Sequence, residues 1–268
     1  MSPSTIPERS TEAPSTPESS MSTARTTSAV SPTDPGVQAG TGRETVRRIL
    51  LGCGVLSSVL YIGAEVYAWT QNPGYSPISQ AFSELLAEGA PSRPFMVAIA
   101  GAPYNLLVAA LGVGVWMSSN GRRPARIAAA LLMLYAVISY LGGTVFQMDP
   151  RGAEGSVRTM LHERATAVMV VSMLLAMTVG AFLHGIRFRL YSLGTLLTVL
   201  VFAGLSFQQV GLLAAHEPAP YLGLIERVNI YAWMLWVAVL SVSIWDHRSA
   251  SAPREGDSFV TTSRQVSR

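Results

Sequence analysis

Apolar residues gather in six long stretches of the chain, none of which carries a polar stripe along one side. A soluble helical bundle would need such a stripe on every helix, and the strands of a membrane barrel would be about half as long and would alternate. Each stretch is close to the roughly 20 residues with which an α-helix crosses a bilayer. The pattern therefore predicts an all-α protein, a bundle of six transmembrane helices. We place them at Ile49 to Trp69, Phe95 to Met117, Ile127 to Met148, Ala165 to His184, Leu190 to Leu213 and Arg227 to Trp245.

Polar segments flank this region at both ends of the chain. Residues 1–45 are rich in Ser, Thr, Pro and Gly, and residues 247–268 are similarly polar. Such segments cannot bury enough apolar surface to fold, so we expect two disordered tails around a six-helix membrane domain at residues 46–246. The chain does not start with the apolar core and cleavage site of a secretory signal, so the first apolar stretch is expected to act as an uncleaved anchor.

Basic residues favour one side of the predicted bundle, and all 19 of them are arginine. Positively charged flanks stay in the cytoplasm, which predicts that both termini are cytoplasmic and that three longer loops lie outside. No organelle or outer-membrane signal is present, so we expect the plasma membrane of a bacterium. The predicted inner flanks hold Arg43, Arg47, Arg48, Arg122, Arg123, Arg126, Arg187, Arg189 and Arg248. The outer flanks hold Arg93, Arg151, Arg158, Arg164 and Arg227, interleaved with Glu84, Glu88, Asp149, Glu154, Glu163, Glu217 and Glu226.

Composition narrows the function classes. Only 13% of the residues are charged and the net charge is +3, which does not suggest nucleic-acid binding and leaves membrane lipids as the expected partners. The single cysteine, Cys53, excludes a disulfide within the chain. Nothing resembles a haem, nucleotide or iron-sulfur motif, so we expect no cofactor.

The first outer loop, Thr70 to Pro94, has a pattern of its own. Ser76-Pro77 is typical of a helix start and Gly89-Ala90-Pro91 of a helix end. We therefore predict a short amphipathic helix that lies on the outer membrane surface or covers the end of the bundle. Its apolar side would consist of Ile78, Phe82, Leu85 and Leu86.

Glu65 and Arg227 are the charged residues most closely associated with apolar stretches. Glu65 lies about one turn from the outer end of the first helix, where it either reaches interfacial water or faces the bundle, staying protonated or pairing with Arg227 or Arg164. Arg227 must also reach water or an acid, and Glu226 is a poor partner because adjacent helical residues point apart. We predict an interhelical ion pair between Arg227 and Asp149, Glu163 or Glu65.

Candidate chemistry gathers at the outer helix ends. Histidine and carboxylates can hold zinc, but no two histidines lie on adjacent helical turns, and we predict no metal site. A hydrolase would use Ser83 or Ser79 as nucleophile with His162 as base, although no nucleophile-elbow glycines surround either serine. The polar residues at the outer helix ends are Ser83, Glu84, Asp149, His162, Glu163, His216, Glu226 and Arg227. The alternative to a functional site is that they are ordinary solvated loop residues.

Three short segments together resemble a known family. They are Gly74-Tyr75-Ser76 with Ser83-Glu84-Leu85, then Phe146 to Pro150 followed by His162, and Gly223 to Arg227. Their order and placement resemble the prokaryotic membrane family known as domain of unknown function 998 over about Arg48 to Trp245, and more distantly the eukaryotic Frag1/DRAM/Sfk1 type, which is associated with lipid handling. The resemblance implies characteristic polar positions at Ser83, Glu84, Asp149, His162, Glu226 and Arg227. It implies no reaction.

Three functions of different classes remain open. The first is binding of a lipid headgroup or small amphiphile in an outward-facing polar vestibule, which suits a site that is apolar below and polar at its rim. The second is a membrane-embedded lipid hydrolase or transferase that uses His162 and Asp149. The third is a proton-coupled transporter that titrates Glu65, although no internal repeat or pair of broken helices is evident. For the first function we predict ligand contacts from Glu84, Asp149, His162, Glu226, Arg227 and Glu65.

Overall fold

The computed structural model describes residues 35–151 and 155–249. Helices dominate this part of the chain, and it contains no strand. In chain order they are α1 (Pro35–Gln71), the 3-10 helix η1 (Phe82–Leu86), α2 (Arg93–Met96), the π-helical turn η2 (Val97–Gly101), α3 (Ala102–Met117), α4 (Arg123–Tyr140), the π-helical turn η3 (Leu141–Val145), α5 (Val157–Gly180), α6 (Ile186–Ala214) and α7 (Leu222–Ser249). The chain divides into two units, residues 1–39 and 40–268, and the bundle described below belongs to the second.

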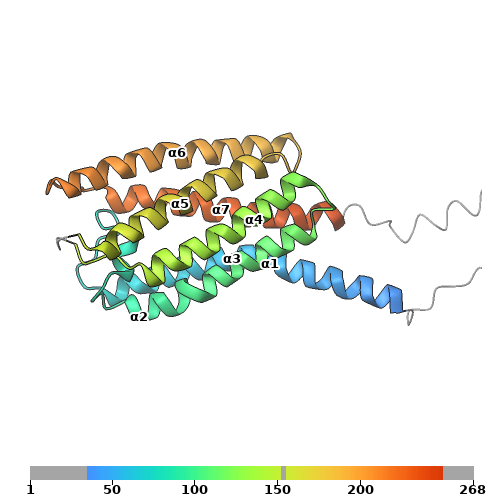
Figure 1. The fold of residues 1–268 in the computed structure, drawn as a ribbon, viewed down its shortest axis with the longest axis horizontal. Helices are drawn as coiled ribbons and strands as arrows, with labels where there is room; N and C mark the ends of the chain where they lie inside the picture. The colour runs from blue at the N-terminus through green and yellow to red at the C-terminus, as the bar shows by residue number, and fades with distance from the viewer. Residues whose placement is uncertain (1–34, 152–154, 250–268) are drawn as a thin grey trace, which may run out of the picture. The chain divides into compact units, whose positions relative to one another are not determined.

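Six helices are long and apolar enough to cross a membrane, which confirms the all-α, six-helix prediction. Each of the predicted apolar stretches corresponds to one of these helices. The spans are Thr41–Gln71, Arg93–Met117, Arg123–Val145, Val157–Gly180, Ile186–Ala214 and Leu222–Trp245. Successive helices run in alternating directions through the bundle (Figure 1).

Two ends of the bundle are distinguished by their connections. The loops that follow α1, η3 and α6 lie at one end, here called the long-loop end, and include residues 72–92, 146–151 and 215–221. The turns at residues 118–122 and 181–185 lie at the other, here called the short-turn end (Figure 1). In the first of these turns Asn120 and Gly121 have φ of 46° and 79°, the left-handed conformation that Asn and Gly tolerate best.

Several helices extend beyond their predicted limits. Helix α5 starts at Val157, because Ser156 caps it by accepting a hydrogen bond from the Thr159 N–H. His162 therefore lies within a spanning helix and not before one. Helix α1 begins at Pro35, inside the predicted tail, and Glu44 supports this extension by binding Arg47 and Arg48 one turn away. The remainder of the predicted tails, residues 1–34 and 250–268, lies outside the described residues.

The core is formed where α3, α4, α5 and α7 meet, around Tyr104, Leu132, Met177, Trp233 and Trp236. Close approach of helices depends on small residues. A Cβ on Gly180 would lie 2.6 Å from the Trp236 ring, and one on Gly114 would lie 3.1 Å from the α1 backbone at Leu51. Helix α6 lies at the edge of the bundle beside α5 and α7, and most of its surface is exposed and apolar, as expected of a lipid-facing helix (Figure 1).

The first long loop is folded differently from the prediction. Its helix is the five-residue η1 and starts at Phe82, so the expected start at Ser76-Pro77 was wrong, and Ile78 is exposed. Over residues 76–81 side chains, including carboxylates, form hydrogen bonds with the backbone in place of the bonds of a helix, as described below. Phe82, Leu85 and Leu86 are buried against α1 and η2, and Phe82 stacks on Tyr61 with ring centres 4.6 Å apart. The loop therefore covers the end of the bundle.

Candidate functional site

A buried ion pair connects the first and last helices at the long-loop end. Arg227 Nε on α7 lies 2.7 Å from Glu65 Oε1 on α1. Their side chains are 6% and 0% exposed, so both charges are removed from water. The prediction that Arg227 pairs with a carboxylate from another helix is confirmed, and Glu65 is the partner among the three that the sequence offered. Glu163 is exposed instead.

The remaining donors of Arg227 bind the first long loop. Nη1 donates to the carbonyls of Pro77 at 2.7 Å and Gln80 at 3.0 Å, as well as to Gly223 at 3.0 Å, one turn earlier in α7. Nη2 donates to the Tyr75 hydroxyl at 2.6 Å. The guanidinium also lies over the Trp69 ring, whose centre is 5.6 Å from the guanidinium carbon. The charge of Arg227 is thus shared between a carboxylate, three carbonyls and aromatic faces of the protein itself.

Two tyrosines extend this network. The Tyr231 hydroxyl donates to Glu65 Oε2 at 2.7 Å, so the carboxylate oxygen that does not contact Arg227 Nε is hydrogen-bonded. Tyr75 accepts from Arg227 and donates to the Ala81 carbonyl at 2.8 Å. Burial raises the pKa of Tyr75 to about 12, which exceeds the opposing effect of the nearby guanidinium. At neutral pH Tyr75 is therefore a neutral group that holds the loop against Arg227.

Glu226 and Glu84, both predicted as ligand contacts, bind backbone groups of the same loop. Glu226 Oε2 accepts from the Phe82 N–H at 2.6 Å, and Glu84 Oε1 accepts from the Ala81 N–H at 2.9 Å. Arg151 reaches across from the second long loop to Glu84 at 2.5 Å. The two carboxylates therefore satisfy the N–H groups at the start of η1, which explains why η1 begins at Phe82.

Asp149, His162 and Ser83 do not assemble into a catalytic group. Asp149 Oδ2 accepts from the Ser156 N–H and the Thr159 hydroxyl at the start of α5, and these bonds lower its pKa. His162 Nδ1 lies 2.9 Å from two backbone carbonyls, that of Gly142 within η3 and that of Phe146 just after it, so this nitrogen carries the proton. Within residues 35–151 and 155–249, no hydrogen bond joins His162 to Ser83 or Asp149, and no three His, Cys, Asp or Glu side chains cluster as metal ligands.

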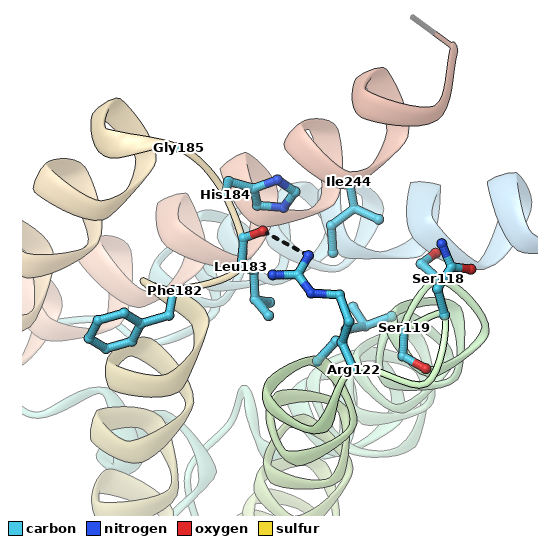
Figure 2. Close-up of a pocket in the computed structure, with 11 residues that line it drawn as sticks. Ser118, Ser119, Arg122, Phe182, Leu183, His184, Gly185 and Ile244 are labelled. Atoms are coloured by element: carbon cyan, nitrogen blue, oxygen red, sulfur yellow. Dashed lines mark hydrogen bonds between the residues drawn. The ribbon is translucent and has the colours of Figure 1, made fainter. Parts of the chain in front are cut away.

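A cavity of about 470 Å³ lies at the opposite, short-turn end (Figure 2). Its walls come from the two turns and the adjacent part of α7. Arg122 stands at its edge and donates to the Leu183 carbonyl at 3.4 Å, a long hydrogen bond that links the two turns. The lining residues are Val115, Ser118, Ser119, Asn120, Arg122, Ala125, Phe182, Leu183, His184, Gly185 and Ile244.

Sequence reasoning missed this cavity. It placed all candidate chemistry at the outer helix ends, and the length of the two short turns carries no information about the space between them. The excess of arginine on this side was the only available signal. Arg47, which is 2% exposed, lies directly behind the cavity wall and donates to the Ser118 hydroxyl at 3.2 Å.

These features define a multi-pass helical membrane protein with a charged, internally bonded cap at one end and a polar cavity at the other. The chain belongs to the family described as protein of unknown function (DUF998), which it matches over residues 55–243. No curated protein and no solved structure matches the chain. The more distant likeness to the Frag1/DRAM/Sfk1 type stays a prediction.

Proposed function

We propose that this protein binds a lipid headgroup or small amphiphile in the cavity at the short-turn end. The observation that carries the proposal is the cavity itself, whose volume of about 470 Å³ is within the usual range for small-molecule sites. Its lining combines hydroxyls, an imidazole and a guanidinium with the apolar side chains of Val115, Leu183 and Ile244. An amphiphile needs this combination of polar and apolar contacts in one place.

The location of the cavity favours a ligand from the membrane. It opens among the turns that join spanning helices, where lipid headgroups would lie. The arginine distribution supports an orientation in which both termini and this end are cytoplasmic. We therefore propose that the protein resides in a bacterial plasma membrane and takes its ligand from the cytoplasmic leaflet.

The long-loop end is less suited to binding. An outward-facing site built from Glu65, Glu84, Asp149, His162, Glu226 and Arg227 stays a prediction, and each of these side chains binds a group of the protein itself. A ligand there would have to replace those bonds. No contact in the described part of the chain favours the hydrolase or the transporter alternative.

Filling the cavity tests the proposal. Gly185 lines it, and a Cβ at this position would meet nothing within 4 Å, so Gly185→Trp introduces a ring into the open space without a backbone clash. Gly155, at the other end, is equally unobstructed and provides the matched control Gly155→Trp. The measurement is the melting temperature of the full chain in detergent with and without added phospholipid.

Binding to the folded state raises its stability by mass action. We expect phospholipid to raise the melting temperature of the wild type and of Gly155→Trp, but not that of Gly185→Trp. A wild type that does not respond, or a Gly185→Trp variant that responds fully, would refute binding in this cavity.

A further inference from the structure

We infer that the cavity at the short-turn end recognises a phosphate group, and that this phosphate belongs to an anionic phospholipid. The inference rests on the proposed function and adds the chemical class of the ligand. Four features of the cavity carry it: the helices that begin at its edge, the charge of Arg122, a serine hydroxyl, and apolar residues in its lining.

Two long helices begin at the cavity. The residues before their first turns, Arg122 for α4 and Gly185 for α6, both line it. Neither helix start is capped by a side-chain hydrogen bond. The first N–H groups of a helix lack partners within the helix, and its dipole attracts negative charge to this end. Two uncapped starts at one cavity therefore favour an anion.

Positive charge at the cavity is not neutralised locally. Arg122 is exposed, and the one described hydrogen bond of its guanidinium, to the Leu183 carbonyl, leaves most of the guanidinium donors available. Arg47 lies behind Ser118 but is paired with Glu44, so the available charge is that of Arg122. No carboxylate occurs among the lining residues in the described part of the chain. The nearby Glu44 is already bound to Arg47 and Arg48.

The wall also offers a serine hydroxyl. Ser119 lines the cavity and is only 4% exposed as a residue, and its hydroxyl is not among the buried atoms that lack a partner in the described part of the chain. With no described hydrogen bond of its own, this hydroxyl is in contact with the cavity, where a bound ligand would reach it. Together with Arg122, it would supply the neutral and charged donors that phosphate oxygens accept.

The apolar part of the lining decides between a lipid and a free phosphate. Phe182, Leu183 and Ile244 contribute apolar surface to the lining, and the Phe182 ring lies at its margin (Figure 2). Phe182 is 54% exposed and lies at the end of a spanning helix, where acyl chains meet headgroups. A phosphate that carries acyl chains would contact both the polar and the apolar residues, whereas inorganic phosphate would use only the polar ones.

The experiment compares three probes on the full chain. Dissociation constants are measured for phosphatidylglycerol and for diacylglycerol in nanodiscs, and for inorganic phosphate alone. The variant Arg122→Gln removes the cavity charge, and Arg187→Gln removes an exposed arginine of the same end that does not line the cavity. Melting temperatures show whether each variant is folded, and Ser119→Ala provides a second cavity variant.

We expect phosphatidylglycerol to bind well, diacylglycerol to bind at least tenfold more weakly, and inorganic phosphate to compete weakly. Loss of a charged hydrogen bond in Arg122→Gln should weaken phosphatidylglycerol binding by about 10- to 100-fold, whereas Arg187→Gln should change it little. Phosphate binding as tight as that of phosphatidylglycerol would support a phosphate site but overturn the lipid source.

Equal binding of diacylglycerol and phosphatidylglycerol, with no effect of Arg122→Gln, would overturn phosphate recognition and leave amphiphile binding intact. Failure of every probe to bind, together with a wild type whose melting temperature does not respond to phospholipid, would refute the proposed function as well. The two failures are therefore distinguishable.

Discussion

The two ends of the bundle use their arginines in opposite ways. At the long-loop end Arg227 is buried and bound to Glu65, Tyr75 and three carbonyls. At the short-turn end Arg122 is exposed beside a cavity, and the one described hydrogen bond of its guanidinium is long. A desolvated charge persists only when the protein satisfies it, whereas a hydrated charge can remain available to a ligand. The comparison indicates that the first end stabilises the fold, whereas the proposed binding site lies at the second.

Among the variants considered, Arg227→Ala is expected to lower the free energy of unfolding most. Removing the guanidinium leaves the Glu65 carboxylate buried without its partner and releases the first long loop, so we expect a loss of about 3–5 kcal/mol in the free energy of unfolding. Denaturant unfolding in detergent measures it. Arg158→Ala, which breaks an exposed pair with Glu88, should cost no more than about 1 kcal/mol.

Adding Glu65→Gln to Arg227→Ala should recover part of the loss, because no charge is then stranded. Equal stabilities for Arg227→Ala and the wild type would show that the ion pair does not hold this end together, and the comparison between the ends would fail.

A smaller effect is expected from an added methyl group at Gly223. A Cβ there would lie 2.1 Å from the Gln80 carbonyl oxygen and 2.6 Å from that of Pro77, the two loop groups that Arg227 binds. Because backbone must move to relieve these contacts, Gly223→Ala should cost about 1–3 kcal/mol. The matched variant Gly185→Ala meets nothing within 4 Å and should cost nothing measurable.

Melting temperatures of the two alanine variants provide the test. If both lose the same stability, the long-loop end is not more tightly packed than the cavity edge.

The smallest effect concerns Tyr75 and is visible in its pH dependence. Tyr75→Phe removes hydrogen bonds to Arg227 and Ala81, so we expect a loss of about 1 kcal/mol at neutral pH. The pKa of Tyr75 is raised from 10.0 to about 12 in the folded protein, so the folded state retains a proton that the unfolded chain releases above pH 10. Stability from Tyr75 is therefore complete below pH 10 and is lost as pH rises towards about 12.

The measurement is the difference in melting temperature between the wild type and Tyr75→Phe from pH 7 to 12. The wild-type advantage should shrink above pH 10. A constant difference across this range would show that Tyr75 is not titrating in the buried setting described.

The six spans were predictable because chain length and hydropathy are local properties: each apolar stretch must cross the membrane as a helix wherever its neighbours lie. Their ends were less predictable. Helix α5 begins at Val157 because of a cap from Ser156, and η1 begins at Phe82 because carboxylates from η1 and α7 bind adjacent backbone. Helix ends depend on which polar group reaches the unpaired N–H, and for η1 one such group is 144 residues away in the chain.

The candidate site, too, was predictable in part from the sequence and in part only from the tertiary structure. The sequence by itself determined that Arg227 must reach water or an acid, since a charge entering an apolar helix cannot stay unsatisfied, and it limited the predicted carboxylate partner to three residues. Only the tertiary structure decided for Glu65, because the choice depends on which helices face each other. The cavity could not be predicted from the sequence. Its volume is the space left between two turns, which is set by the packing of α3 to α7 and not by a local pattern of residues.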